Sequence, residues 1–104
     1  MTQRKRTLLR AADRAQAKLA RDLEKLARMA PGGTPERAVV ITSPAEVEVR
    51  ARGTPCPICQ GELRVDEHTA ETILGTRVRV ARVTCATCGR KRALYFRLGA
   101  TLVN

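Results

Sequence analysis

The sequence predicts a small α+β protein in which an N-terminal amphipathic helix precedes a β domain. Apolar residues recur every three or four positions over residues 7–30, which is the period of one face of a helix. From residue 39 onward they tend to alternate with polar residues, as they do in strands with one buried face. Four cysteines stand in two C-x-x-C pairs in a chain of 104 residues that has one Tyr, one Phe and no Trp. A core so poor in aromatic side chains needs an additional stabilising element.

The predicted helix has an apolar stripe and a well-defined end. Pro31, Gly32 and Gly33 follow it and supply a helix breaker and residues that accept positive φ. We therefore divide the chain into a basic helical arm (1–30), a Pro/Gly linker (31–36) and a second domain (37–104). Arg4-Lys5-Arg6 opposes the helix dipole, so we expect that tip to be a flexible basic tail. The stripe consists of Leu8, Ala12, Ala15, Leu19, Leu23, Leu26 and Ala30.

Five strands are predicted after the linker. They are centred on Val39–Ile41, on 46–51, on the segment that begins with Leu63 and Val65, on 78–83 and on 94–98. Alternation fails at Ala81–Arg82, where we expect a bulge or a strand end. The residues expected to point inward are Val78, Val80, Leu94, Phe96 and Leu98.

The two cysteine pairs, Cys56/Cys59 and Cys85/Cys88, have the spacing of metal ligands. A two-residue gap lets both sulfurs of a pair face one ion, and Gly61 and Gly89 can adopt positive φ just after each pair. A redox site would need a thioredoxin-like βαβ context, and disulfides would need an oxidising compartment. We therefore expect one structural Zn²⁺, held by four cysteines with no open coordination position for chemistry.

The pattern CPxCxG…CxxCG resembles that of the zinc-ribbon superfamily over about residues 46–98. The resemblance implies a β-ribbon built around a four-cysteine zinc site. It is specific for fold and metal but not for function, because zinc ribbons occur in transcription factors, RNA polymerase subunits, ribosomal proteins and adaptors.

Two narrower resemblances are weaker. The cysteine spacing is similar to that of transcript-cleavage elongation factors, which carry an Asp-Glu pair between their two cysteine pairs. Asp66-Glu67 lies in that interval, but its neighbours do not match, so a solvated acidic turn is preferred. Bacterial RNA-polymerase regulators that combine a coiled coil with a four-cysteine zinc finger use two helices and a shorter gap.

The net charge of +10 favours an anionic partner. A second helical stripe is almost wholly basic, and it predicts nucleic-acid binding, contact with an acidic protein surface, or simply a solvated face. It consists of Arg6, Arg10, Arg14, Lys18, Arg21, Lys25 and Arg28.

A second basic surface is predicted on the β domain. The side chains expected to point outward together are those of Arg77, Arg79, Tyr95 and Arg97. Directly after the second cysteine pair and its glycine come Arg90, Lys91 and Arg92. Arginines around one exposed ring resemble a phosphate-plus-stacking surface for single-stranded ligands. The alternative is the ordinary solvent face of a sheet.

The remaining residues indicate a non-enzymatic, cytoplasmic protein. His68 is expected in an exposed turn, and no P-loop, G-x-S-x-G or HExxH motif is present. The start of the chain resembles neither a signal peptide nor a membrane span, although its Arg-rich, acid-poor composition also fits an organellar transit peptide. We expect nucleic-acid binding, or docking in a transcription or ribosomal assembly. The alternative is a protein–protein adaptor that uses the Ala/Leu stripe, including as a homodimer. Neither a membrane nor a small-molecule substrate is expected.

Overall fold

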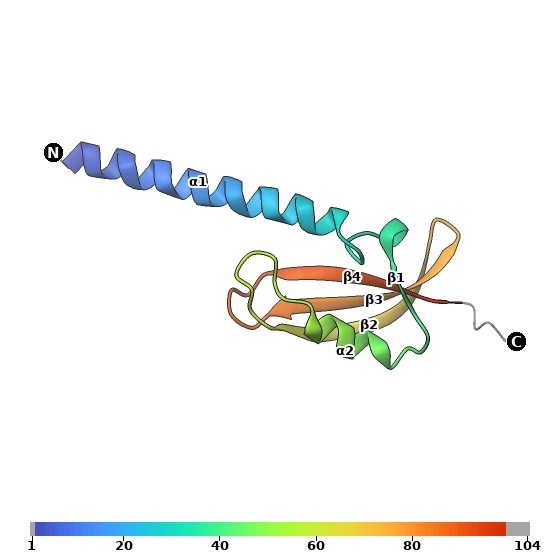
Figure 1. Cartoon of the computed structure of the whole chain (residues 1–104). Coiled ribbons are helices and arrows are strands. Elements are labelled where there is room, and N and C mark those ends of the chain that lie inside the picture. The colour runs from blue at the N-terminus through green and yellow to red at the C-terminus, as the bar shows by residue number, and fades with distance from the viewer. Residues whose placement is uncertain (1, 100–104) are drawn as a thin grey trace, which may run out of the picture.

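The computed structural model describes residues 2–99, with side chains from Lys5, so Met1 and 100–104 of the expected domains lie outside the described residues. The elements are α1 (Thr2–Met29), a 3₁₀ turn η1 (Pro35–Arg37), β1 (Val39–Ile41), α2 (Glu46–Gly53), β2 (Leu63–Ile73), β3 (Thr76–Cys85) and β4 (Lys91–Leu98) (Figure 1). One sheet has the strand order β1-β4-β3-β2, in which only the β1–β4 pair is parallel. The small α+β class predicted from the sequence is confirmed.

Helix α1 is longer than predicted at its N-terminal end. It begins at Thr2, so the expectation that Arg4-Lys5-Arg6 forms a flexible tail is wrong. Like charge near an exposed helix N-terminus costs only about 0.3–1 kcal/mol and is screened by salt. At the other end Gly32 has φ 83°, and a Cβ on Gly33 would lie 2.2 Å from the carbonyl oxygen of Ala27. The glycines therefore end the helix as predicted.

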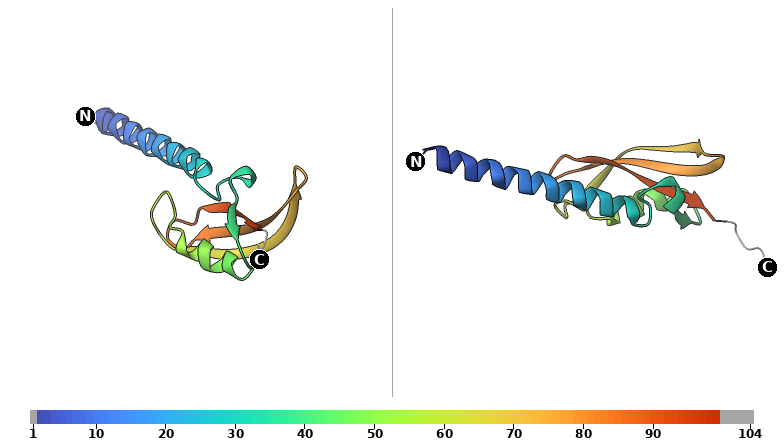
Figure 2. Two further views of the ribbon diagram at one scale, coloured as in Figure 1. Left: turned by 45° about the vertical axis from the view of Figure 1, so that its right-hand side comes forward. Right: turned by 90° about the horizontal axis from the view of Figure 1, so that it is seen from above.

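Helix α1 projects away from the sheet (Figures 1 and 2), and the molecule measures 74 × 25 × 21 Å. Every residue from Lys5 to Leu19 is exposed, whereas Ala20, Leu23, Glu24 and Ala27 are half-buried. At 100° per residue, these four lie on a flank of the helix that runs from Leu23, at the margin of the apolar stripe, toward the basic stripe. The helix therefore approaches its own domain with neither the basic stripe nor the centre of the apolar stripe.

Residues 46–51 form a helix and not the predicted strand. The Glu46 carboxylate accepts hydrogen bonds from the Thr42 hydroxyl (2.8 Å) and the Ser43 backbone N–H (2.9 Å). The Glu46 contact to the Ser43 N–H is one half of a capping box, a pattern that begins helices, while the Ser43 hydroxyl accepts from the Ala45 N–H (3.3 Å). Val47 and Ala51, four residues apart, are fully buried, while Val49 is 66% exposed. The Glu-Val-Glu-Val alternation therefore reflects one buried helix face.

The core lies between α2 and one face of the sheet, which α2 covers by packing on β2 and β3. Its side chains are small and mostly aliphatic, as the scarcity of aromatic residues requires, and two of the four cysteines belong to it. The cluster consists of Ile41, Val47, Ala51, Cys56, Leu63, Ala81, Val83, Cys85, Leu94 and Phe96.

The predicted inward set is divided between the two faces of the sheet. Val80 pairs with Tyr95, whereas Ala81 pairs with Leu94, and directly opposed residues share a face. Val80 and Ala81 are both fully buried. The expectation that Val78 and Val80 share a face with Leu94 and Phe96 is therefore wrong. The buried side chains of β3 change from one face of the sheet to the other between Val80 and Ala81, so both faces of the strand are covered there.

The expected irregularity near Ala81–Arg82 lies on the neighbouring strand. The register shifts between Val65 and Glu67, so Asp66 is the extra residue opposite Val83 and Arg82. Asp66-Glu67 and the half-buried His68 consequently lie within β2, and their assignment to turns is wrong. The turn of this hairpin comes at Leu74 and Gly75, both with positive φ (50° and 79°), as a tight two-residue connection requires.

Candidate metal centre and cationic surface

The two cysteine pairs lie on turns that have the same backbone hydrogen bonds. The Cys56 carbonyl accepts from Gln60 N–H (2.8 Å), and Cys56 N–H donates to the Gly61 carbonyl (2.9 Å). The Cys85 carbonyl likewise accepts from Gly89 N–H (3.0 Å), and Cys85 N–H donates to the Arg90 carbonyl (2.9 Å). Each turn is therefore closed by the fourth and fifth residues after its first cysteine.

The glycines after the pairs have different roles. Gly89 has φ 77°, as expected, but in the first turn the positive φ belongs to Gln60 (64°), so the expectation for Gly61 is wrong. A Cβ on Gly61 would lie 2.6 Å from Thr87 Oγ1 and 3.0 Å from Cys85 Sγ. Gly61 is therefore required because the second turn packs directly against it.

The four sulfurs of Cys56, Cys59, Cys85 and Cys88 lie within 4.8 Å of one another. Cys56 Sγ is 3.8 Å from Cys88 Sγ, and Cys59 Sγ is 3.4 Å from Cys85 Sγ. Sulfurs bound tetrahedrally at about 2.3 Å from one ion are ~3.8 Å apart. The four side chains could therefore bind one metal ion with little rearrangement.

Backbone N–H groups point at the sulfurs and favour their charged form. Cys85 Sγ accepts from the N–H groups of Cys88 and Thr87, both at 3.4 Å. The Cys88 N–H is the main reason that the pKa of Cys85 is lowered to about 6. At Cys59 the Gly61 N–H also acts to lower the pKa, but the adjacent Cys85 sulfur and burial outweigh it and raise the pKa to about 11. Thiols this close cannot all ionise without a cation between them, which is the condition that a metal ion satisfies.

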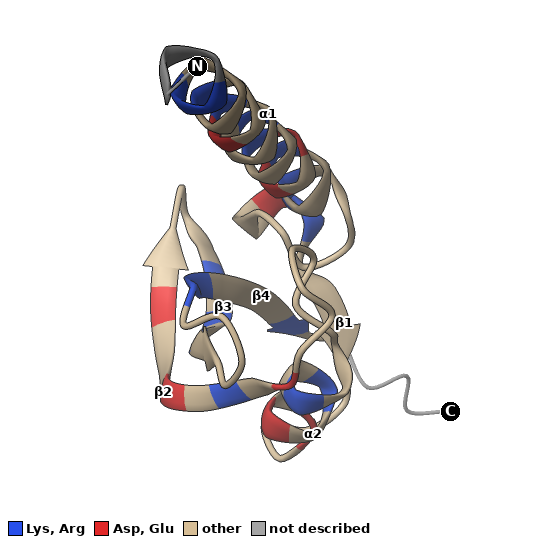
Figure 3. Ribbon diagram, turned by 90° about the vertical axis from the view of Figure 1, so that its left-hand side faces the viewer, with Lys and Arg blue, Asp and Glu red and all other residues tan. Residues whose placement is uncertain are grey.

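The helix stripe and the residue that leaves the second cysteine turn form one cationic surface. Arg21, Lys25 and Arg28 of α1 line a hollow together with Arg90. Basic residues recur along the whole of α1 and again on β4 (Figure 3). Within residues 5–99 no ion pair joins any of the seven stripe residues to an acid. Two groups that the sequence presents separately are therefore contiguous and free to meet an anion.

The other predicted basic surface is not a single surface. Arg79 pairs with Phe96, whereas Tyr95 pairs with Val80, so Arg77 and Arg79 lie on one face of the sheet and Tyr95 and Arg97 on the other. Arg97 lines a hollow at the hairpin tip beside Glu36. The interpretation of these four as one surface around Tyr95 is wrong, because the face assignment of β3 on which it depended is wrong.

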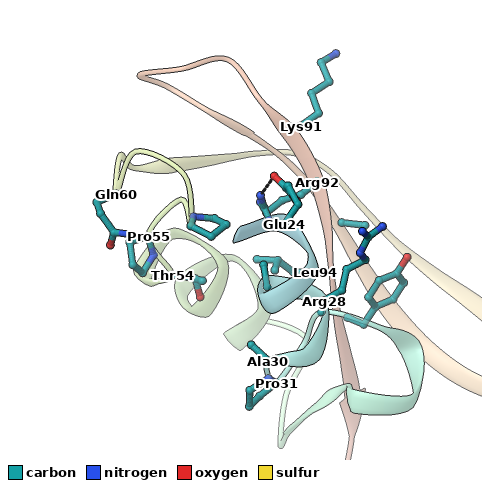
Figure 4. A pocket seen from close by; sticks show the side chains of 15 residues that line it. Glu24, Arg28, Ala30, Pro31, Thr54, Pro55, Gln60, Lys91, Arg92 and Leu94 are labelled. Atoms are coloured by element: carbon teal, nitrogen blue, oxygen red, sulfur yellow. Dashed lines mark hydrogen bonds and ion pairs between the residues drawn. The ribbon is translucent and has the colours of Figure 1, made fainter. Parts of the chain in front are cut away.

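Arg92 and Tyr95 instead line a cavity of about 480 Å³ between the end of α1, the first cysteine turn and β4 (Figure 4). Arg92 forms an ion pair with Glu24, so it serves first to anchor α1. Thr54, Pro55 and Gln60 line the opposite wall. No motif marks these residues in the sequence, because the cavity exists only where three distant segments meet.

Neither a family model, nor a curated protein, nor a solved structure matches this chain. The structure is that of a small α+β protein with a projecting helix and four cysteines that could bind one metal ion. Within residues 2–99, no helix combines the length and apolar composition needed to cross a membrane.

Proposed function

We propose that the metal is zinc and that the chain is a non-enzymatic zinc-ribbon protein that binds nucleic acid through the cationic surface. An all-cysteine, near-tetrahedral donor set favours zinc among the common metals. Four protein ligands leave no coordination position for water or substrate, so the ion has a structural role. The similar hydrogen bonds of the two cysteine turns support the assignment to a zinc ribbon.

The observation that carries the nucleic-acid proposal is the continuity of α1 with Arg90. From Arg6 to Arg28 the stripe covers about 33 Å at 1.5 Å per residue, close to one turn of a duplex. Arg90 and the exposed Lys91 extend it onto the β domain. A polyanion along this line would relieve the repulsion between like charges three and four residues apart. A transcription or ribosomal assembly is the setting that we propose for this interaction.

A salt titration tests the proposal. Four to six phosphate contacts predict that log K for duplex DNA falls with log salt at a slope of roughly −4 to −5. Reversing Arg21 and Lys25 to Glu is expected to weaken binding and flatten this slope. Reversing Arg77 and Arg79 to Glu makes the same change in net charge away from the cationic surface, so it is the matched control. Micromolar or weaker binding with no salt dependence, for both DNA and RNA, would refute the proposal.

A second candidate function is self-association through α1. Leu8, Leu19 and Leu26 are 70%, 59% and 62% exposed, and within the described residues only Leu23 of this stripe is half-buried. The alanines between them permit close helix–helix approach, and the basic stripe on the opposite side would stay free. A second copy of the chain is the occupant that we propose. Sedimentation should then show concentration-dependent mass that Leu19→Arg abolishes and Val49→Arg, at an exposed site on α2, leaves unchanged.

A further inference from the structure

We propose that the cavity between α1, the first cysteine turn and β4 accepts one unstacked nucleobase of a single-stranded nucleic acid. The inference rests on the proposed nucleic-acid function and adds a preference for single strands to it. A volume of about 480 Å³ lies within the range of small-ligand sites.

The walls of the cavity suit a flat, largely apolar group. Ala27 lies near the end of α1 and Pro31 just after it, and Pro55 and Pro57 flank Cys56. Tyr95, on the opposite face of β4 from Leu94, borders the cavity at the edge of the strand. Figure 4 shows Pro31, Pro55 and Leu94 on three different segments around the cavity. Aromatic rings accept nucleobases by stacking irrespective of sequence.

A buried guanidinium in the cavity has an unused donor. The side chain of Arg92 is only 10% exposed, and its Nε is buried without a hydrogen-bond partner. Its Nη2 is already bound to Glu24. A buried donor left unpaired is costly, and because Nε has almost no accessible surface, a carbonyl or ring nitrogen of a base would satisfy it only after the Arg92 side chain turned Nε toward the cavity.

The open edge of β4 adds a backbone donor and acceptor. β1 pairs only with residues 96–98 of β4, and Tyr95 N–H donates to the Gly32 carbonyl (2.8 Å) on the same edge. Because strand residues alternate, the Ala93 N–H and C=O point toward this edge, where Ala93 lines the cavity. The edges of unstacked bases are recognised by such pairs of donors and acceptors.

The charges around the cavity favour nucleic acid over a peptide strand. Arg28 and Lys91 line it, and Arg28 also lines the hollow shared with Arg21, Lys25 and Arg90. A strand whose phosphates follow the cationic surface therefore passes the cavity. Bases within a duplex are stacked and cannot enter, so the cavity selects single strands.

Tyrosine fluorescence can report on the cavity, because Tyr95 is the only tyrosine in the sequence and there is no tryptophan. We would titrate the full, metal-loaded chain with a 12-nucleotide oligothymidylate and with an abasic oligomer of equal length and charge. Stacking should quench tyrosine emission with oligothymidylate only. It should also tighten binding over the abasic oligomer by roughly 5- to 150-fold.

Substitutions at Tyr95 complete the test, with circular dichroism to confirm that each variant folds. Tyr95→Leu should reduce the affinity for oligothymidylate to that for the abasic oligomer, whereas Tyr95→Phe, which keeps the ring, should retain the difference. Equal affinity of the wild-type chain for both oligomers, without quenching, would overturn the base site but leave the proposed function intact. Failure to bind either oligomer or a duplex would overturn both. Quenching by an acidic peptide but by neither oligomer would assign the cavity to a protein ligand and overturn this inference.

Discussion

Glu24 of α1 and Arg92 of β4 form an ion pair between residues 68 positions apart. Within residues 5–99 it is the one salt bridge between the long helix and the sheet. The Tyr95–Gly32 backbone hydrogen bond lies just beyond the end of the helix. The direction of α1 is therefore fixed by contacts confined to its C-terminal end.

Glu24→Gln should weaken the attachment of α1 to the sheet. The guanidinium of Arg92 would lose its charged partner, at a cost of about 1 kcal/mol in unfolding free energy because Glu24 is partly exposed. Residual dipolar couplings should fit one rigid orientation of α1 and sheet in the wild-type chain and no single orientation in the variant. Asp22→Asn makes the same change in charge on α1 without touching a salt bridge, and identical couplings in both variants would contradict the role of the pair.

Removal of the metal should unfold the β domain. Structural zinc contributes roughly 10–16 kcal/mol in small modules, comparable with the whole stability of a domain, and Cys56 and Cys85 belong to the core. A chelator is expected to abolish the β-sheet circular dichroism of residues 37–99, and one equivalent of Co²⁺ should restore it with absorption bands of a tetrahedral thiolate site. Native spectra after verified metal removal would contradict this.

Gly61→Ala should impair the metal centre although it changes no ligand. The added methyl would meet Thr87 and Cys85 Sγ, and disturbed outer contacts typically weaken metal binding 10- to 100-fold, so a loss of about that size is expected. Competition with a chromophoric chelator measures it. Gly53→Ala is the control, because nothing lies within 4 Å of a Cβ at that position.

Val47→Ala and Val49→Ala distinguish a helix from a strand over residues 46–53. In a strand the two valines would face the same side, whereas in α2 only Val47 is buried. Val47→Ala should cost roughly 2 kcal/mol of unfolding free energy in buried methyl groups, and Val49→Ala less than about 0.5 kcal/mol. Equal losses on denaturant titration would favour the strand.

The cap of α2 should make stability depend on pH in the acid range. The Thr42 hydroxyl, and then the N–H groups of Thr42 and Ser43, lower the pKa of Glu46 below its usual 4.5. A carboxyl with a lowered folded-state pKa stabilises fully above its unfolded pKa and loses this effect as the pH falls through the folded value. The stability difference between wild type and Glu46→Gln should therefore be constant above about pH 5 and shrink below pH 4.5. A difference that does not change over this range would contradict the cap.

The sequence predicted the elements whose patterns are long. The helix of 7–30, its Pro/Gly end and the β-hairpin segments follow from periods repeated over many residues. The six residues from Glu46 to Ala51 are too few to distinguish a helix from a strand. Val47 and Val49, two apart, fit the period of a strand, and Val47 and Ala51, four apart, fit the period of a helix. The Ser43–Glu46 capping box is the signal that would have settled it.

The candidate site was predictable in its ligands but not in its surroundings. The spacing within each C-x-x-C pair indicates that both of its sulfurs could face one ion, and the fold brings the two pairs together. The face that Arg77 or Tyr95 occupies depends on the crossing of β3 between two buried rows at Val80 and Ala81, and a bulge at Asp66 accompanies it. Likewise, only the tertiary fold brings Arg90 beside Arg21.

Because α1 contacts the domain only near its C-terminal end, a small rotation there would move its N-terminal end over a longer distance. Thr2, where α1 begins, is about 33 Å from Glu24 at 1.5 Å per residue, so a rotation of about 5° at the Glu24–Arg92 pair would displace that tip by roughly 3 Å. Arg6 and Arg10, near that tip, would move further than any other cation of the stripe.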